Sequence, residues 1–199
     1  MQTETGRIEA FSDGVFAIAI TLLVLDLKVP YAVEKGLAAA LLKQWPAYLA
    51  YVMSYMYIGV MWINHHRLFT HIRRSDDTLL VLNLLLLLGI TSVPFPTSVL
   101  SSHLGGPQQR TAAIVYDGVY LVIAVLFNLL WRHAVARELL DKNYLQSAAM
   151  ITKQYAFGPV IYLVCLLTAW ISVPISLILN GVLAVFFLIP PHKLAARKA

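Results

Sequence analysis

The chain has few charged residues and a single cysteine, and both shortages narrow what it can be. Charged side chains make up only 13% of its 199 residues, about half the share found in soluble domains. The one cysteine, Cys165, lies among Leu and Val residues, so the sequence indicates neither an intrachain disulfide nor a thiolate metal site. A soluble domain and a disulfide-rich secreted domain are therefore both poor descriptions of this chain.

Several motifs of enzymes and channels are also missing. The sequence has no G-x-S-x-G elbow, no phosphate-binding Walker loop and no H-E-x-x-H pair. The adjacent His65 and His66 would point about 100° apart on a helix, so both could not ligate one haem. A T-V-G-Y-G filter and a regular series of arginines are absent too. We expect no catalytic residues, no metal and no cofactor, and any ion selectivity must use another device.

Apolar residues dominate what is present. Hydrophobic side chains make up 59% of the chain, and the mean hydropathy is +0.73. Segments of about 20 apolar residues are long enough to cross a bilayer as helices. The sequence predicts an all-α integral membrane protein: a six-helix bundle that forms one domain over residues 1–199. The predicted spans are 8–28, 46–66, 78–100, 111–131, 150–170 and 173–190. Prolines at 94, 96 and 159 predict kinks or local unwinding inside spans three and five.

Positive charges predict the orientation of these spans. If both termini are cytoplasmic, the basic residues outside are only Lys28, Lys35, Lys43 and Arg110, and the remaining Lys and Arg residues lie inside. The net charge of +5 then reflects membrane orientation, and we expect no nucleic-acid partner.

The start of the first predicted span carries the strongest functional signal. Polar residues between Arg7 and Asp13 directly precede an apolar run, and such groups at the mouth of a membrane helix are costly unless they are paired or hydrated. Further along, Ile18, Leu22 and Leu25 are spaced to form one apolar stripe, with Thr21 beside it. This stripe could line a narrow pore, or it could pack against lipid and other helices.

Two further groups of residues could cooperate with this helix. Asp26 at its far end could form an acidic ring in an oligomer, or it could be a single solvated carboxylate or form a surface pair with Lys28. At the end of the second span, Trp62, Asn64 and His65 face the same side of the membrane as the polar start of the first. We expect an Arg7–Asp13 ion pair, completed by Asn64 or a histidine, to hold the base of the first helix against the second.

The segment Arg7-x-x-x-Phe11-Ser12-Asp13, followed by an apolar helix, resembles the signature of the transmembrane protein 175 family of potassium-permeable channels. The resemblance extends more loosely to Trp62, Asn64, His65 and the six-span length. It implies a homotetramer in a prokaryotic plasma membrane, in which the first helix of every subunit lines the pore and potassium ions permeate.

The resemblance also implies roles for individual residues. Ile18 matches the position of the tightest apolar constriction, and Leu22 and Leu25 continue the pore wall. Thr21 matches a threonine linked to selectivity, which either faces or backs the pore. The remaining matches hold the pore helix in place without binding the ion: Arg7, Phe11, Ser12, Asp13, Trp62, Asn64 and His65. Weak selectivity for potassium over sodium is expected.

Two other functions remain open from the residues alone. A secondary transporter or proton-coupled carrier could use His65, His66 or Asp117 as a proton relay. Asp117 falls near the outer end of the fourth span, where a contact at the mouth or in a loop is the simpler interpretation. A haem-containing redox enzyme could use one of the histidines as an axial ligand.

Overall fold

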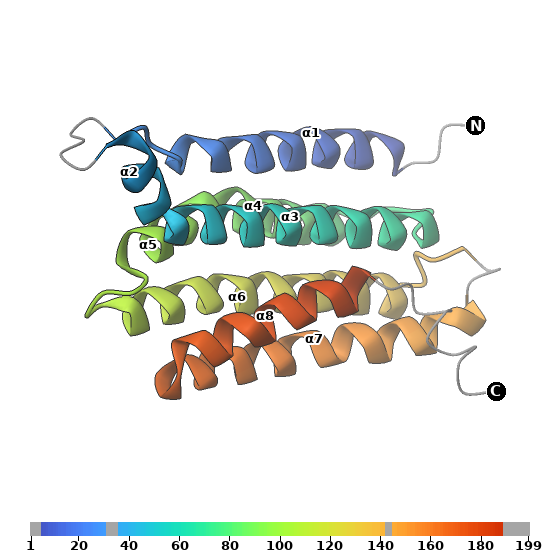
Figure 1. The fold of residues 1–199 in the computed structure, drawn as a ribbon. Helices are drawn as coiled ribbons and strands as arrows, with labels where there is room; N and C mark the ends of the chain where they lie inside the picture. Colours follow the sequence, from blue (N-terminus) through green and yellow to red (C-terminus); the bar gives the residue numbers. More distant parts are fainter. Residues whose placement is uncertain (1–4, 31–35, 142–144, 189–199) are drawn as a thin grey trace.

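The computed structural model describes residues 5–30, 36–141 and 145–188, and these residues are almost entirely helical. The helices are α1 (Gly6–Leu22), η1 (Leu23–Asp26, a 3-10 turn), α2 (Leu37–Lys43), α3 (Trp45–His71), α4 (Asp77–Ser92), α5 (Pro94–His103), α6 (Gln109–Ala136), α7 (Leu145–Ile171) and α8 (Val173–Leu188). The long helices lie side by side along one direction (Figure 1). The fold is therefore the all-α bundle that the sequence predicts.

Five helical segments are long and apolar enough to cross a membrane: Gly6–Asp26, Trp45–His71, Asp77–His103, Gln109–Ala136 and Ile151–Ile171. They coincide with the first five predicted spans. The sixth predicted span corresponds to α8, which is apolar but has only 16 residues. The short helix α2 was not predicted.

Local sequence explains where several helices begin. The Asp76 side chain caps α4 by accepting a hydrogen bond from the Leu79 N–H at 2.8 Å. Pro46 and Pro94 lie in the first turns of α3 and α5, where the missing N–H of proline costs nothing.

The two predicted kinks have different outcomes. In the third span the α-helical hydrogen bonding is interrupted at Val93, between α4 and α5, because Pro94 has no N–H to donate, although Val93 itself keeps an α-helical backbone. In contrast, α7 continues as a helix past Pro159.

One end of the bundle collects most of the described basic residues. There α1 and α4 begin, and α3 and α6 end (Figure 1). We call it the basic end, and it carries Arg7, Arg67, Arg73, Arg74, Arg132 and Arg137. The opposite end carries Lys28, Lys43 and Arg110. These six arginines are among the basic residues that the sequence predicts on the cytoplasmic side of the membrane. The directions of the helices place them at the same end of the bundle.

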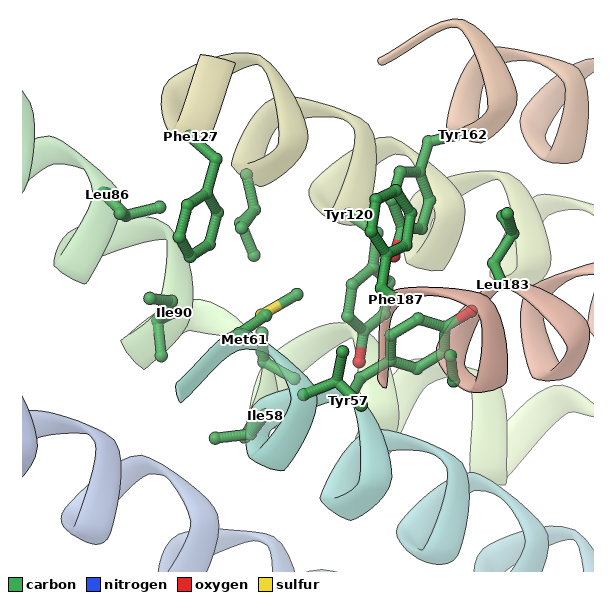
Figure 2. Close-up of a cluster of buried hydrophobic side chains, with 14 of the residues drawn as sticks. Tyr57, Ile58, Met61, Leu86, Ile90, Tyr120, Phe127, Tyr162, Leu183 and Phe187 are labelled. Atoms are coloured by element: carbon green, nitrogen blue, oxygen red, sulfur yellow. The ribbon is translucent and has the colours of Figure 1, made fainter. Parts of the chain in front are cut away.

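The core contains an aromatic cluster between α3, α6, α7 and α8. Figure 2 shows Tyr57, Tyr120, Tyr162 and Phe187 converging there from these four helices. The Tyr57 and Tyr120 ring centroids lie 4.5 Å apart, within the range of favourable aromatic pairs. The cluster lines a small cavity of about 50 Å³. The cluster therefore joins α3, α6, α7 and α8 through aromatic contacts.

Candidate functional site

Helix α1 has one buried face and one exposed face. Its buried residues are Ser12, Phe16 and Ala19, and Leu23 of η1 extends the same stripe at spacings of three and four. This stripe packs against α3 and α4. The packing fixes the rotation of α1 about its axis, so the opposite face is directed away from the bundle.

The exposed face carries the predicted pore stripe. Ile18, Leu22 and Leu25 are 60%, 42% and 71% exposed in the single chain. The α-helix tightens into η1 at Leu23, so Leu25 belongs to a 3-10 turn and departs from ideal α-helical spacing. Large branched apolar side chains thus stand outward at three successive levels.

Thr21 lies on the exposed side of α1 as well. Its hydroxyl donates to the Ile18 carbonyl at 2.8 Å, which fixes the hydroxyl proton within the helix. The lone pairs of the hydroxyl oxygen stay available, because this bond uses only the proton. The Thr21 oxygen can therefore still act as an acceptor on the exposed side of the helix.

A hydrogen bond ties the base of α1 to α3. The Trp62 indole Nε1 donates to Asp13 Oδ1 at 2.8 Å. The acceptor is a carboxylate, which makes this bond stronger than one between neutral groups. The ring of Trp62 also lies stacked against His66, with centroids 6.3 Å apart.

A second, fully buried connection joins α1, α3 and α4 through Asn83. The Asn83 amide Nδ2 donates to Ser12 Oγ at 3.1 Å, and Asn83 Oδ1 lies 2.9 Å from His65 Nε2. Because Oδ1 can only accept, the proton of His65 is assigned to Nε2. Phe16 and Phe69 pack on the His65 ring with centroid distances of 5.4 and 4.5 Å. The network is thus polar at its centre and closed by aromatic rings.

Three of the predicted anchoring residues make other contacts in the single chain than the sequence suggests. Arg7 forms no ion pair with Asp13, because six helical residues place the two side chains on different faces and Trp62 occupies the carboxylate. Asn64 contacts α8 by donating to the Phe187 carbonyl at 3.3 Å and does not complete the α1 network. Phe11 is exposed and takes no part in the buried contacts.

The sequence reasoning missed Asn83. It is the only polar side chain between Thr78 and Thr91 in a helix of leucines, and a lone amide in a membrane span signals a hydrogen-bonded contact. Its partners could not be named, because they lie 18 and 71 residues away along the chain.

Asp26 is half-buried where the helix ends. Among the described residues it forms no ion pair, with Lys28 or any other residue. The carboxylate thus stands at the opposite end from the basic end, one residue beyond the exposed Leu25.

A groove of about 320 Å³ runs along the junction of α1 and α3. It is lined by Asp13, Phe16, Ala17, Ile20, Ile58, Gly59 and Trp62. Most of its wall is apolar, and the hydrogen-bonded Asp13 and Trp62 are its lining residues nearest the basic end.

Asp117 differs most from its expected place. The simpler interpretation was a contact at the mouth or in a loop, but the side chain is fully buried between α6 and α8. Its Oδ2 atom lies 2.6 Å from Ser176 Oγ, and its Oδ1 atom accepts a hydrogen bond from Asn180 Nδ2 at 2.9 Å. The Asn180 oxygens in turn accept from the Tyr57 hydroxyl. This interior network lies apart from the α1 face.

Within the described residues, no group of three or more His, Cys, Asp or Glu side chains is arranged to hold a metal ion. His65 is committed to Asn83 and enclosed by two phenylalanine rings. The candidate site is therefore the exposed face of α1 together with the contacts that attach this helix to α3 and α4.

Comparison with known proteins identifies the family to which this chain belongs. Residues 7–94, which include all of α1 except Gly6 and the whole anchoring network, match the family model described as the endosomal/lysosomal potassium channel TMEM175. A potassium channel of Chamaesiphon minutus is 52% identical over 191 residues, covering 94% of each chain. The chain belongs to the TMEM175 family. This family consists of ion channels and is not an enzyme family, and the chain is a membrane protein.

Two more relatives show the range of the family. A crystal structure of a lysosomal potassium-selective channel TMEM175 homolog from Chamaesiphon minutus superposes with a TM-score of 0.87 at 51% identity, covering 94% of this chain and 97% of that one. The endosomal/lysosomal proton channel TMEM175 of Bos taurus is 34% identical over 161 residues. That match covers 76% of this chain and 33% of the bovine protein.

Proposed function

We propose that this chain forms a potassium-permeable channel in which α1 from each of four copies surrounds a central pore. Potassium is the permeant ion, and the conduction path needs no cofactor. Support comes from the potassium-channel names of relatives that match nearly the whole chain. The role of α1 is supported by a single structural observation. The apolar stripe of α1 points outward. The opposite face of α1 is buried at Ser12 and Phe16 and is hydrogen-bonded to Asn83 of α4.

Ile18, Leu22 and Leu25 form the constriction in this proposal. Four isoleucine side chains at one level would leave no polar group to replace the hydration of a cation. The closed pore would therefore block ions both sterically and by losing its water. Opening requires α1 to rotate or splay, and the contacts at Asp13 and Ser12 set the pivot at its base.

Selectivity for potassium over sodium is modest in this proposal. The larger ion gives up its hydration at lower cost where the wall offers few ligands. Thr21 contributes hydroxyl oxygens next to the Ile18 level. Four copies of Asp26 form an acidic outer mouth that raises the local cation concentration. The anchoring residues act on the helix position and do not bind the ion.

The proposed topology has six spans in a single domain, in the plasma membrane of a prokaryote. The basic end and both termini face the cytoplasm, as the distribution of Arg and Lys favours. With its 16 residues, α8 is about 24 Å long. The hydrocarbon core is about 30 Å thick, so α8 spans it only where neighbouring residues extend the helix or the bilayer thins.

The test is Ile18→Asn in purified protein reconstituted into a planar bilayer. An amide at the constriction wets it, so we expect a higher single-channel conductance or open probability in a potassium gradient. The matched control is Ile178→Asn, because Ile178 is 66% exposed on α8, away from the proposed pore. Native mass spectrometry of both variants checks that the tetramer is intact.

An intact Ile18→Asn tetramer with unchanged current would remove Ile18 from the constriction. A current that rises equally in Ile178→Asn would place the pore elsewhere. Ion flux also separates the channel from a carrier: single-channel currents exceed any turnover by alternating access, whereas saturating, slow flux would favour the transporter alternative.

A further inference from the structure

The interior carboxyl of Asp117 has no cationic partner within residues 5–30, 36–141 and 145–188. The side chain is completely buried between membrane helices, and none of the ion pairs among the described residues includes it. An ionised carboxylate in such surroundings is strongly disfavoured unless a cation or several donors compensate its charge. Only hydrogen-bond donors near Asp117 could therefore compensate a negative charge on its carboxyl group.

The hydrogen-bond donors around Asp117 are one proton short. Ser176 Oγ lies 2.6 Å from Asp117 Oδ2 and 3.0 Å from the Cys165 carbonyl oxygen. Both are acceptors when Asp117 is ionised, but a serine hydroxyl has a single proton to donate. The two protons of the Asn180 amide are directed at Asp117 Oδ1 and at the Ser176 carbonyl, each at 2.9 Å. Asn180 therefore cannot supply the missing proton.

A proton on Asp117 Oδ2 satisfies every contact at once. Asp117 then donates to Ser176 Oγ, and the serine hydroxyl is free to donate to the Cys165 carbonyl. The 2.6 Å separation suits an O–H donor facing a hydroxyl oxygen. We propose that Asp117 is a proton-binding site inside each subunit, occupied at neutral pH and separate from the α1 face.

The described groups that face this site do not offer an alternative charge. α3 contributes the Tyr57 hydroxyl, which already donates to Asn180. α6 contributes the neighbouring Tyr116, which is hydrogen-bonded to Ser54, and α7 contributes Cys165 and Tyr162. α8 contributes only Ser176 and Asn180. None of these side chains is a cation at neutral pH.

Water at the opposite end from the basic end gives the site a source of protons. A largely polar pocket of about 620 Å³ opens there, at the first turns of α6 and α8. Two of its lining residues, Ala169 and Val173, lie four residues from Cys165 and three from Ser176. This is about one helical turn along each axis. The barrier between pocket and carboxyl is therefore thin.

The same geometry argues against a proton wire through the subunit. Beyond Asp117, the next group toward the aromatic cavity is the Asn180 side chain. An amide does not readily pass a proton from its oxygen to its nitrogen. The site therefore loads and unloads from one side of the membrane and stores a proton instead of conducting it.

Infrared spectroscopy of the full-length protein in lipid tests the proposal directly. At neutral pH we expect a C=O band of a protonated carboxyl that shifts in D₂O. The band should be lost in Asp117→Asn, whose amide preserves the neutral shape of the site. It should persist in the control Asp26→Asn, since Asp26 lies outside the network. This measurement does not depend on whether the protein conducts ions.

Two results would overturn the proposal. One is a folded wild-type protein without the band, and the other is a band that survives Asp117→Asn or follows Asp26→Asn. If Asp117→Asn does not fold, Ser176→Ala decides, because it removes the acceptor of the carboxyl proton. The band should then move to higher frequency, as expected for a carboxyl without a hydrogen-bond acceptor, and an unshifted band would contradict the assignment.

Discussion

Trp62 donates its indole proton to Asp13 across 49 residues of sequence, with the two heavy atoms 2.8 Å apart. This bond joins the base of α1 to α3 at the point where the apolar groove between the two helices ends. In the proposed channel it limits how far α1 can tilt. Its strength is therefore relevant to both stability and gating.

Replacing Trp62 with phenylalanine should weaken this attachment. An aromatic ring is kept, but Asp13 loses its donor, at a cost of about 1.5–3 kcal/mol for a hydrogen bond to a charged group. We expect the midpoint of thermal unfolding in detergent to fall by about 3–12 °C. Trp45→Phe is the matched control, because Trp45 is exposed at the start of the same helix. Equal midpoints for the two variants would show that the bond contributes nothing.

Asn83→Leu should be more damaging, because it leaves two buried polar partners. Ser12 and His65 both lose a hydrogen bond, and an unsatisfied buried group costs about 1–3 kcal/mol. We expect a loss of about 2–4 kcal/mol in denaturant unfolding. Ser12→Ala should then cost less in the Asn83→Leu background than in the wild type. Strictly additive losses would argue that Ser12 and Asn83 are energetically independent.

Acid should loosen the basic end through Asp76. The Leu79 N–H, His133 and Arg137 lower the pKa of the Asp76 carboxyl below its usual value. A lowered pKa stabilises the fold above the unfolded-state value of about 4, and this contribution is lost as pH falls through the folded-state pKa. We expect the unfolding midpoint to drop below about pH 4 in the wild type and to change less in Asp76→Asn. The control is Asp77→Asn, because Asp77 is the exposed neighbour of Asp76. If the unfolding midpoint of Asp77→Asn depended as weakly on pH as that of Asp76→Asn, the acid sensitivity could not be assigned to Asp76.

Gly89→Ala should disturb the contact between α4 and α6. A Cβ atom at Gly89 would lie 2.9 Å from Ile123 Cγ1, so the isoleucine must move. Overpacking of this kind costs about 1–3 kcal/mol. Gly181→Ala is the control, because no atom lies within 4 Å of a Cβ built there. We expect a lower unfolding midpoint only for Gly89→Ala, and two unchanged midpoints would mean that Ile123 adapts freely.

The sequence predicted the features of α1 that depend on local periodicity. Ile18, Leu22 and Leu25 were predicted to form one apolar stripe because residues three and four apart share one side of a helix, and all three side chains are exposed in the single chain. Membrane spans were predicted for the same reason, since length and hydropathy are local properties. The break at Val93 followed from Pro94.

Predictions of long-range partners were less successful. Asp13 was paired with Arg7 in the sequence analysis, yet it binds Trp62 on another helix. Asn64 was assigned to the α1 network, yet it turns toward α8. In both cases several polar groups could have satisfied the same side chain, and only the rotation and height of the packed helices select one.

The amino-acid sequence by itself determined a helical membrane protein of the TMEM175 family with one apolar stripe on its first helix. These properties follow from composition, from spacing along single helices and from a short motif. The tertiary structure decided that Asn83 joins three helices and that Asp117 is sealed inside the bundle. Such contacts join residues 18 to 71 positions apart, and they exist only once packing has fixed which faces of the helices meet.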